Sequence, residues 1–424
     1  MARLLQISFT PFRTAIEEGV IQHRITKGAE TLKYFPAIVW SDSSPWREVN
    51  LWAHQRATAS TVTIKTVQSN MRSLAYYASW LESNDLDWWH FPAKKQDRCL
   101  LRFRGHLIKA RDGGELSPST VSQRMRDVIS FYKWLKATGL LKPEWPMWTD
   151  RTAKIVLVNQ FGFERTMSVS TTDLSIPNRT RPGERLEDGL LPVSAIDRSA
   201  ILKVTKEHAS MELYLMLQLG FFTGMRLGTI CDLKVETLHN AVPDPTTPAM
   251  YRLNVGPGAK PSVQTKFGVT GQVWITERHL NLLLDYSISR RRLMRQLRAD
   301  PSSKDLVFIT RYGNSYSATG SSSSPVNVEM LSLRKKGSIL GVNALGGFHF
   351  HQSRCTYATE LAKILIPKGG AINALAIIKE ALLHKDEATS LKYIRFVEKT
   401  PAKIAVANEF SRLLMGDILG DLPK

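Results

Sequence analysis

The chain has 424 residues, of which 43% are hydrophobic, so it is long enough for two or three packed domains and too apolar to be disordered. Lys and Arg total 57 against 38 Asp and Glu, which gives a formal net charge of +19. This excess of positive charge favours a polyanionic partner, with nucleic acid as the first expectation.

Cysteine usage and hydropathy indicate the compartment. Cys99, Cys231 and Cys355 are few, odd in number and far apart, which indicates neither a disulfide framework nor a zinc site. A reducing cytoplasm fits this pattern. No apolar run approaches the ~20 residues of a membrane span, and the N-terminal sequence lacks the apolar segment of a signal peptide. We therefore expect a cytoplasmic protein without membrane attachment.

The N-terminal extension, residues 1–46, is the hardest part of the chain to interpret. It holds an apolar run from Phe35 to Trp40 that ends at a polar turn. Two interpretations stay open, namely a strap packed on the next domain and an accessory arm that contacts DNA.

Residues 47–142 have a helical pattern. Apolar residues recur with a period near 3.6 from Val67 to Leu81 and again from Val121 to Leu135. Ser117 followed by Pro is typical of a helix start, and Gly139 is placed to end that helix. Any single cation here could belong to a solvated surface. As a set they favour contact with the DNA backbone, because phosphate binding sums over many cations: Lys65, Arg72, Arg124, Arg126 and Lys133.

The next segment, residues 143–193, is rich in Ser, Thr, Pro and Gly, which is the composition of a linker. A second domain is predicted for residues 194–400. It opens with helices, and Gly224 allows a tight turn before Arg226. Strands are predicted between Tyr251 and Ile275, with Lys266 at the edge of a turn. A basic helix follows, whose face could track phosphates or be merely solvated: Arg290, Arg291 and Arg295.

The stretch from Phe348 to Phe396 carries the groups for chemistry. His351 and Arg354 lie three apart at the start of an apolar helical pattern, so they can point the same way and grip one anion. His384 precedes Tyr393 by nine positions across a polar turn. An Arg, two His and a Tyr around one phosphate would suit attack of the phenol on phosphorus.

Other residues of the same types compete with these by type alone. His349 is the rival of His351, but only His351 has an Arg three positions later. Tyr312 and Tyr357 are rivals of Tyr393, and Tyr357 fits the apolar face of its predicted helix.

From about residue 48 to 410 the chain resembles the tyrosine recombinase (phage integrase) family. The resemblance rests on the string TGMRLGTICDL, on the nine-residue spacing before the tyrosine, and on six typed positions in the family's order: Arg226, Lys266, His351, Arg354, His384 and Tyr393. It implies a mainly α fold with a small β-hairpin or sheet. A helical core-binding domain and a mixed α/β catalytic domain would form a clamp around DNA. The tail, residues 401–424, is expected to be an amphipathic helix that packs on its own domain or docks into a neighbouring protomer.

The resemblance implies a site-specific recombinase that acts as a tetramer on two duplexes at specific recombination sites. Tyr393 would attack phosphorus and leave a 3′-phosphotyrosyl bond, which conserves the ester's energy without ATP. Arg226 and Arg354 would bind the non-bridging oxygens, with hydrogen bonds from His351 and His384. His351 would also act as general base, and Lys266 as general acid toward the 5′-oxygen. No metal or other cofactor is expected.

Three departures from the family pattern stand out. Thr229 lies where an acidic residue is common, and Cys355 follows the second Arg where His is common. The interval between Arg354 and His384 is longer than usual, with IPKGG as the expected insertion. Two other functions remain possible: a type IB topoisomerase-like enzyme acting on one duplex, and a non-catalytic DNA-binding accessory protein on the same fold.

Overall fold

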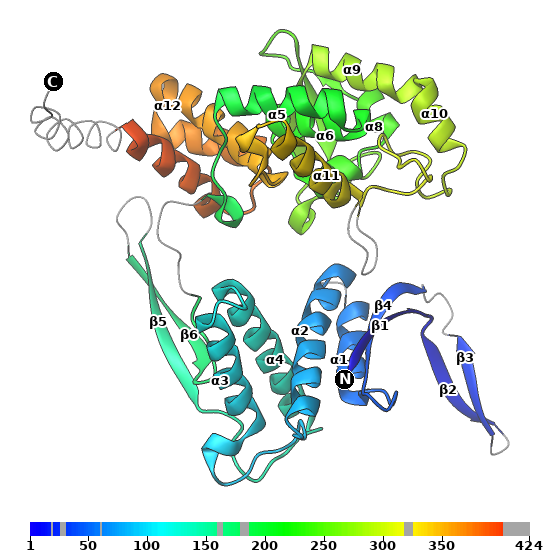
Figure 1. Cartoon of the computed structure of the whole chain (residues 1–424), viewed down its shortest axis with the longest axis vertical. Helices are drawn as coiled ribbons and strands as arrows, with labels where there is room; N and C mark the ends of the chain where they lie inside the picture. The colour runs from blue at the N-terminus through cyan, green and yellow to red at the C-terminus, as the bar shows by residue number, and fades with distance from the viewer. Residues whose placement is uncertain are drawn as a thin grey trace, which may run out of the picture. The chain divides into compact units, whose positions relative to one another are not determined.

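The computed structural model describes residues 1–17, 20–25, 31–59, 62–158, 164–178, 186–317 and 325–401. The chain divides into two compact units, Met1–Pro182 and Gly183–Lys424, and each has its own hydrophobic core (Figure 1). Helices dominate both units, and the described strands form small antiparallel sheets. The predicted fold class, mainly helical with small hairpins, is confirmed.

The core of the first unit is built from helices α1 (Arg47–Thr58), α2 (Ile64–Ser83), α3 (Cys99–Asp112) and α4 (Pro118–Thr138), with the short η1 (Lys95–Asp97) before α3. The apolar residues that recur along α2 and α4 are buried in one cluster. The Ser117 side chain accepts a hydrogen bond from the backbone N–H of Thr120 and caps α4, and Gly139 ends that helix in the left-handed region with φ 71°.

The N-terminal extension contains two separate β structures. Strand β1 (Arg3–Phe9) pairs with β4 (Leu32–Val39), and this pair packs against α1 and α2 with Phe35 and Ile38 buried. Strands β2 (Phe12–Glu17) and β3 (Val20–Ile25) form a hairpin on which Ile16 and Ile25 are exposed. The first pair is the packed strap that one of the two interpretations predicted.

The predicted linker contains structure that its composition did not suggest. Strands β5 (Asp150–Val158) and β6 (Glu164–Thr172) form a nine-pair antiparallel hairpin, and Leu174 and Ile176 join the core of the first unit. Alternating Ser and Thr can line one face of a two-stranded ribbon, so a polar composition does not exclude pairing. Residues 186–193 belong to the second unit.

The second unit is organised around the apolar helix α6 (Met211–Thr223), which packs against α5 (Ala195–His208) and α12 (His351–Ala381). Short helices α7 (Leu227–Cys231) and α8 (Val235–His239) follow it. The sheet has the strand order β7 (Val242–Pro243), β8 (Met250–Val255), β9 (Gly271–Thr276). The unit also contains the helices α9 (Glu277–Ile288), α10 (Arg290–Gln296), α11 (Pro325–Ile339) and η4 (Asn343–Leu345).

Strands were predicted between Tyr251 and Ile275, but residues 262–266 within this stretch do not form one. One isolated bridge joins Val263 to Gly256, and Lys266 begins a single 3-10 turn, η3 (Lys266–Gly268), in the loop between β8 and β9. Phe267 has φ 65° in this turn, which breaks the extended backbone that pairing needs.

Helix α12 begins at His351, as the sequence pattern predicted, and holds the expected IPKGG insertion at a kink where Gly370 has φ 73°. Contrary to the sequence-based expectation, α12 is long and apolar enough, by length and composition alone, to cross a membrane. Its first turns pack against α6 with Arg354 buried, whereas Ile364 and Ile372 in its middle are exposed. Residues 387–401 are helical, whereas residues 402–424 of the expected tail helix lie outside the described part.

Candidate active site

Arg226 and Arg354 are brought together by close packing of α6 on α12. A Cβ on Gly220 would lie 2.2 Å from Ser353 Oγ, and one on Gly224 would lie 2.5 Å from the Tyr357 ring. Gly224 also has φ 67°, in the left-handed region that favours glycine. These glycines let α6 approach the first turns of α12, and Arg226 follows the turn as the residue before α7.

The Arg354 guanidinium is buried, and each of its three nitrogens donates a hydrogen bond. It donates from Nη1 to the carbonyl oxygen of Gly224 at 2.6 Å and from Nη2 to that of Leu382 at 2.8 Å. Its Nε donates to Glu187 Oε2 at 3.1 Å. Burial and the neighbouring Arg226 lower the pKa of Arg354, and the carboxylate of Glu187 opposes this shift. Burying such a charge is tolerated because each edge of the guanidinium has an acceptor.

His384 and Tyr393 face the same point from the chain after α12. Their rings stack with centroids 6.1 Å apart and planes 8° from parallel. His384 Nδ1 shares a 2.8 Å hydrogen bond with the buried Ser390 hydroxyl, which fixes the ring and turns Nε2 toward the site. Burial lowers the pKa of His384, so its neutral form is favoured.

The Tyr393 side chain is completely buried, and its hydroxyl donates to Glu187 Oε2 at 3.2 Å. Cys355 Sγ lies 3.8 Å from the same hydroxyl, so the residue that departs from the family pattern still touches the tyrosine. Burial first, and then the charges of Cys355 and Glu187, raise the pKa of Tyr393 far above its usual range. Tyr393 is therefore a neutral phenol in this structure.

Glu187 is the functional residue that the sequence reasoning missed. It lies in the turn η2 (Glu187–Gly189), and its Oε1 accepts from Arg226 Nη2 at 2.7 Å. Its Oε2 is also 3.6 Å from His351 Nε2 and 3.5 Å from His384 Nε2. Burial alone would raise the pKa of Glu187, but these histidines and arginines together hold it far below its usual range. The polar, Gly-rich sequence around Glu187 did not indicate a buried carboxylate. The arginines, which need an acceptor when they are buried, were the only hint that such an anion was missing from the prediction.

Lys266 lies at the edge of the site. It lines one small pocket with Arg226, Thr229 and Arg354, and its ammonium lies 5.4 Å from the centre of the Phe267 ring. Phe267 is exposed, so the loop that carries Lys266 borders on solvent. The structure thus places Lys266 beside the two arginines.

The rival residues lie elsewhere. His349 is exposed before α12, and Tyr312 is exposed beside Arg311. Tyr357 packs against Gly224, and burial raises its pKa to about 12. Of these residues, His351 and Tyr393 are the ones in contact with Glu187.

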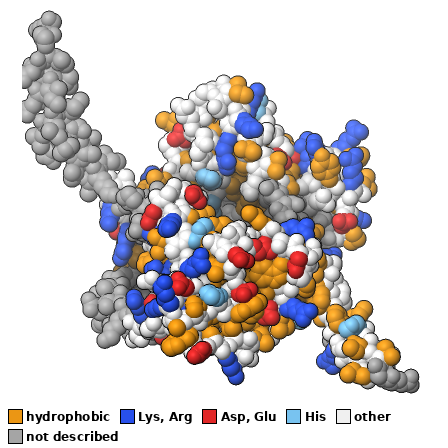
Figure 2. All heavy atoms as spheres, turned by 60° about the horizontal axis from the view of Figure 1, so that its bottom comes forward, with side chains coloured by type: hydrophobic (Ala, Val, Ile, Leu, Met, Phe, Trp, Pro, Cys, Tyr) orange, Lys and Arg blue, Asp and Glu red, His pale blue; other side chains and the backbone are white. Residues whose placement is uncertain are grey.

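The cations predicted in the first unit lie on helices α2 and α4. Arg72 and Arg124 line a polar pocket with hydroxyl groups of Ser69, Ser119 and Thr120. A second pocket, between α4 and the residues around Ile176, is lined by Arg126 and Lys133 together with Ser and Thr side chains. Lys65 is exposed at the start of α2. On the face seen in Figure 2, basic side chains form small groups among acidic and hydrophobic ones.

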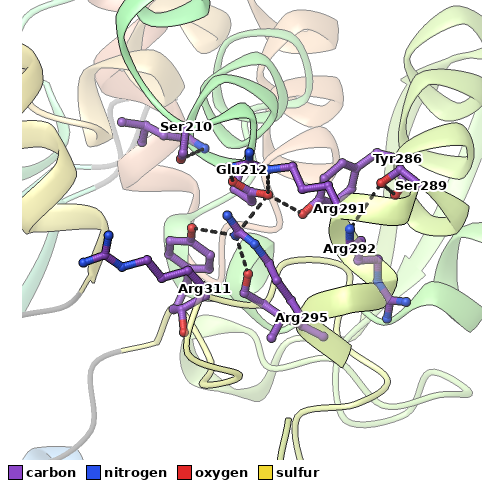
Figure 3. A network of polar contacts seen from close by, with 12 residues as sticks. Ser210, Glu212, Tyr286, Ser289, Arg291, Arg292, Arg295 and Arg311 are labelled. Carbon is purple, nitrogen blue, oxygen red and sulfur yellow. Dashed lines mark hydrogen bonds and ion pairs between the residues drawn. The ribbon is translucent and has the colours of Figure 1, made fainter. Parts of the chain in front are cut away.

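The basic helix α10 differs from the expectation of a phosphate-tracking face. Arg291 donates to both oxygens of the fully buried Glu212 at 2.8 and 2.9 Å, and Arg295 is 3.0 Å from the same carboxylate (Figure 3). Arg295 is itself buried and also donates to the carbonyl oxygen of Ile309. Because residues four apart share a helix face, both arginines turn inward to Glu212 on α6. Arg290 is exposed.

No family model matches the chain, and no curated protein matches it. Among solved structures the chain is similar to the Tn1549 transposon integrase in complex with circular intermediate DNA, at 13% identity and a TM-score of 0.48, over 82% of this chain and 93% of that one. It is similar to a lambda integrase dimer bound to a COC′ core site, at 12% identity and a TM-score of 0.46, over 82% and 94%. It is also similar to XerA recombinase, at 16% identity and a TM-score of 0.33, over 82% and 91%. At these values the likeness assigns no function, so the function has to be argued from the site.

Proposed function

We propose that this chain is a site-specific DNA recombinase or integrase of the tyrosine recombinase family. The observation that supports this proposal is the convergence of two guanidinium groups, two imidazoles and a phenol on the single carboxylate of Glu187. They come from four places in the second unit: the turn after α6, the start of α12, the turn after α12 and the helical residues 387–401. A phosphodiester at this position would meet the donors that its transesterification needs.

The reaction is an exchange of esters at phosphorus. The Tyr393 Oη–P bond forms and the bond from phosphorus to the 5′-oxygen breaks, so the DNA is left with a 3′-phosphotyrosyl end and a free 5′-hydroxyl. The phenolic proton passes to His351, and the 5′-oxygen receives a proton from Lys266. Attack by a 5′-hydroxyl on the phosphotyrosyl bond reverses these steps and rejoins a strand.

The arginines stabilise the charge that grows on the non-bridging oxygens. Arg354 is held by two backbone carbonyl groups, so its Nε keeps a fixed direction toward the anion. Arg226 approaches the other oxygen through Nη2. Since both charges are in place before DNA arrives, little reorganisation is needed during the reaction.

DNA binding is shared between the units in this proposal. Residues 47–142 bind the duplex through the cations around α4, and residues 194–400 carry out catalysis. Two such protomers on each of two duplexes form a tetramer, in which residues 401–424 contact a neighbour. Sedimentation of the protein with DNA that carries its site tests the tetramer directly.

Trapping the covalent intermediate tests the chemistry. The full chain is incubated with a library of duplexes of random sequence, each nicked so that a short fragment with a 5′-hydroxyl diffuses away after cleavage. We expect a protein–DNA adduct on a denaturing gel, which Tyr393→Phe abolishes and Tyr312→Phe retains. Sequencing of the trapped DNA then yields the target site. No adduct from the wild-type chain on a site to which it binds would reject the mechanism.

One observation also fits a non-catalytic DNA-binding protein, because Glu187 occupies the position where the phosphate would react. Specific DNA binding without any adduct, in the wild type and in variants of Glu187, would favour that function. If adducts form, a strand-exchange assay with two marked sites separates recombination from the relaxation of one duplex.

A further inference from the structure

The Glu187 carboxylate stands where a phosphodiester would be held. Its Oε1 binds Arg226, and its Oε2 binds Arg354 and the Tyr393 hydroxyl. The two carboxylate oxygens thus use the same donors that would hold two non-bridging phosphate oxygens. Carboxylates and phosphates are the anions whose geometry an arginine fork matches best, so one can stand in for the other.

A phosphate and this carboxylate cannot share the site. Both are anions, and two like charges within about 4 Å repel strongly in a partly buried site. The Tyr393 hydroxyl is also engaged, because its proton is directed to Glu187 Oε2. In-line attack on phosphorus requires that hydroxyl to face the phosphate, so the carboxylate has to leave first.

The turn that carries Glu187 is held by apolar side chains and by hydrogen bonds of the residues that follow it to the first turns of α12. Gln352 donates to the carbonyl oxygen of Leu191, and the backbone N–H of Val193 donates to Thr356. Leu186 is buried in a small cluster with Leu382, Tyr393 and Ile394. The backbone of the turn is closed by hydrogen bonds between Leu186 and Leu190 and from Gly189 to Leu186. Leu190 packs against the same cluster as Leu186, and Cys355 Sγ contacts the carbonyl oxygen of Glu187. Release of the turn would break these contacts, but it would break no backbone hydrogen bond within α6 or α12.

A permanent supporting role for Glu187 is less consistent with these contacts. Arg354 is already fixed by the carbonyl groups of Gly224 and Leu382, and His384 by Ser390. The buried Nε of Arg226 makes no hydrogen bond in the described part of the chain, so that guanidinium retains capacity for another acceptor. Arg354 and His384 therefore have their directions set without Glu187, whereas Arg226 is directed by the carboxylate itself.

We propose that Glu187 is an autoinhibitory substitute for the scissile phosphate, which a DNA phosphodiester displaces when it enters the site. This inference rests on the proposed function, because it takes the Arg226–Arg354 position to be the phosphate site. It predicts that the free protein binds simple phosphate-like anions weakly and that removing the charge of Glu187 uncovers the site.

The test measures binding of inorganic phosphate and orthovanadate to the full chain by calorimetry. Glu187→Gln keeps the shape of the side chain and removes its charge, and we expect it to bind both anions at least tenfold more tightly than the wild type. Leu186→Ala keeps the carboxylate and weakens the anchor of the turn, and we expect a smaller gain of about threefold. Glu360→Gln is the matched control, since Glu360 pairs with Lys363 on the surface of α12.

The trapping assay is run on the same variants in parallel. If Glu187→Gln and Leu186→Ala bind phosphate no more tightly than Glu360→Gln, the autoinhibitory role is wrong even where an adduct forms. If Glu187→Gln does not fold, the Leu186→Ala result decides the matter alone. If phosphate binding rises as expected but no variant forms an adduct through Tyr393, Glu187 guards an anion site and the recombinase proposal is the one that fails.

Discussion

Replacing Arg354 by Lys tests whether the site depends on a guanidinium fork or merely on a positive charge. The structure assigns three acceptors to the Arg354 side chain, namely the carbonyl oxygens of Gly224 and Leu382 and the carboxylate of Glu187. These acceptors lie around a planar group, and the single ammonium of Lys cannot reach all three.

The expected loss of unfolding free energy follows from the hydrogen bonds that Arg354→Lys removes. If Lys keeps one of the three contacts, two charge-assisted hydrogen bonds disappear, each of which contributes about 1.5–3 kcal/mol. The second unit should lose roughly 3–6 kcal/mol of unfolding free energy. For a unit of this size that loss lowers its Tm by roughly 6–24 °C. Loss of a fixed donor at the phosphate should also slow adduct formation by about 10²- to 10³-fold.

Scanning calorimetry of the full chain is the suitable assay, because it resolves the transitions of two units. Arg334→Lys is the matched control: Arg334 donates from Nε to the carbonyl oxygen of Phe348 in the same unit. Loss of this single bond should cost about 1.5–3 kcal/mol. If Arg354→Lys is as stable as the control and forms adduct at the wild-type rate, the fork is not needed and the site has been assigned to the wrong residues.

The remaining predictions concern the acid, the DNA contacts and pH. Lys266→Ala should slow cleavage, and a 5′-bridging sulfur, which leaves without a proton, should restore it; failure of that rescue would mean that Lys266 is not the acid. Arg126→Ala and Lys133→Ala should each reduce the salt dependence of DNA binding by about one unit of slope, whereas Arg291→Ala should leave the slope unchanged and lower stability. Because the pKa of His384 is lowered by burial, the unfolded chain binds its proton more readily. The stability of the second unit should therefore fall as pH drops below about 6.5, and His384→Asn should weaken that dependence in calorimetric titrations.

Local sequence signals correctly predicted the turn and the helix start that position the site. Gly224 has the left-handed conformation expected at a turn, and α12 begins at His351, so that Arg354 lies one turn into the helix. These features depend on a few adjacent residues, and caps, turns and apolar periodicity describe such features directly. The role of each side chain in catalysis stays a prediction until the trapping assay is done.

Long-range pairing was not predictable from the same signals. Arg291 looked like a solvated cation because its partner, Glu212, comes 79 positions earlier in a strongly apolar segment. Glu187 likewise lies 167 positions from Arg354 in a segment of linker composition. Single-sequence reasoning recognises that a buried guanidinium needs an acceptor, but it does not say which distant carboxylate supplies it.

The two arginine–carboxylate clusters of the second unit differ in the elements that carry their carboxylates. This difference is the reason why one cluster can exchange its carboxylate for another anion in our proposal. Glu212 lies in the first turn of α6, and its partners Arg291 and Arg295 lie on α10, so regular helices hold all three groups. Tyr286 also donates to Glu212, and this cluster has the rigid character of a structural network. In the other cluster the arginines are held by helices or backbone carbonyl groups, whereas the carboxylate comes from a single 3-10 turn. Under our proposal, an incoming anion displaces the carboxylate on the short turn rather than the arginines.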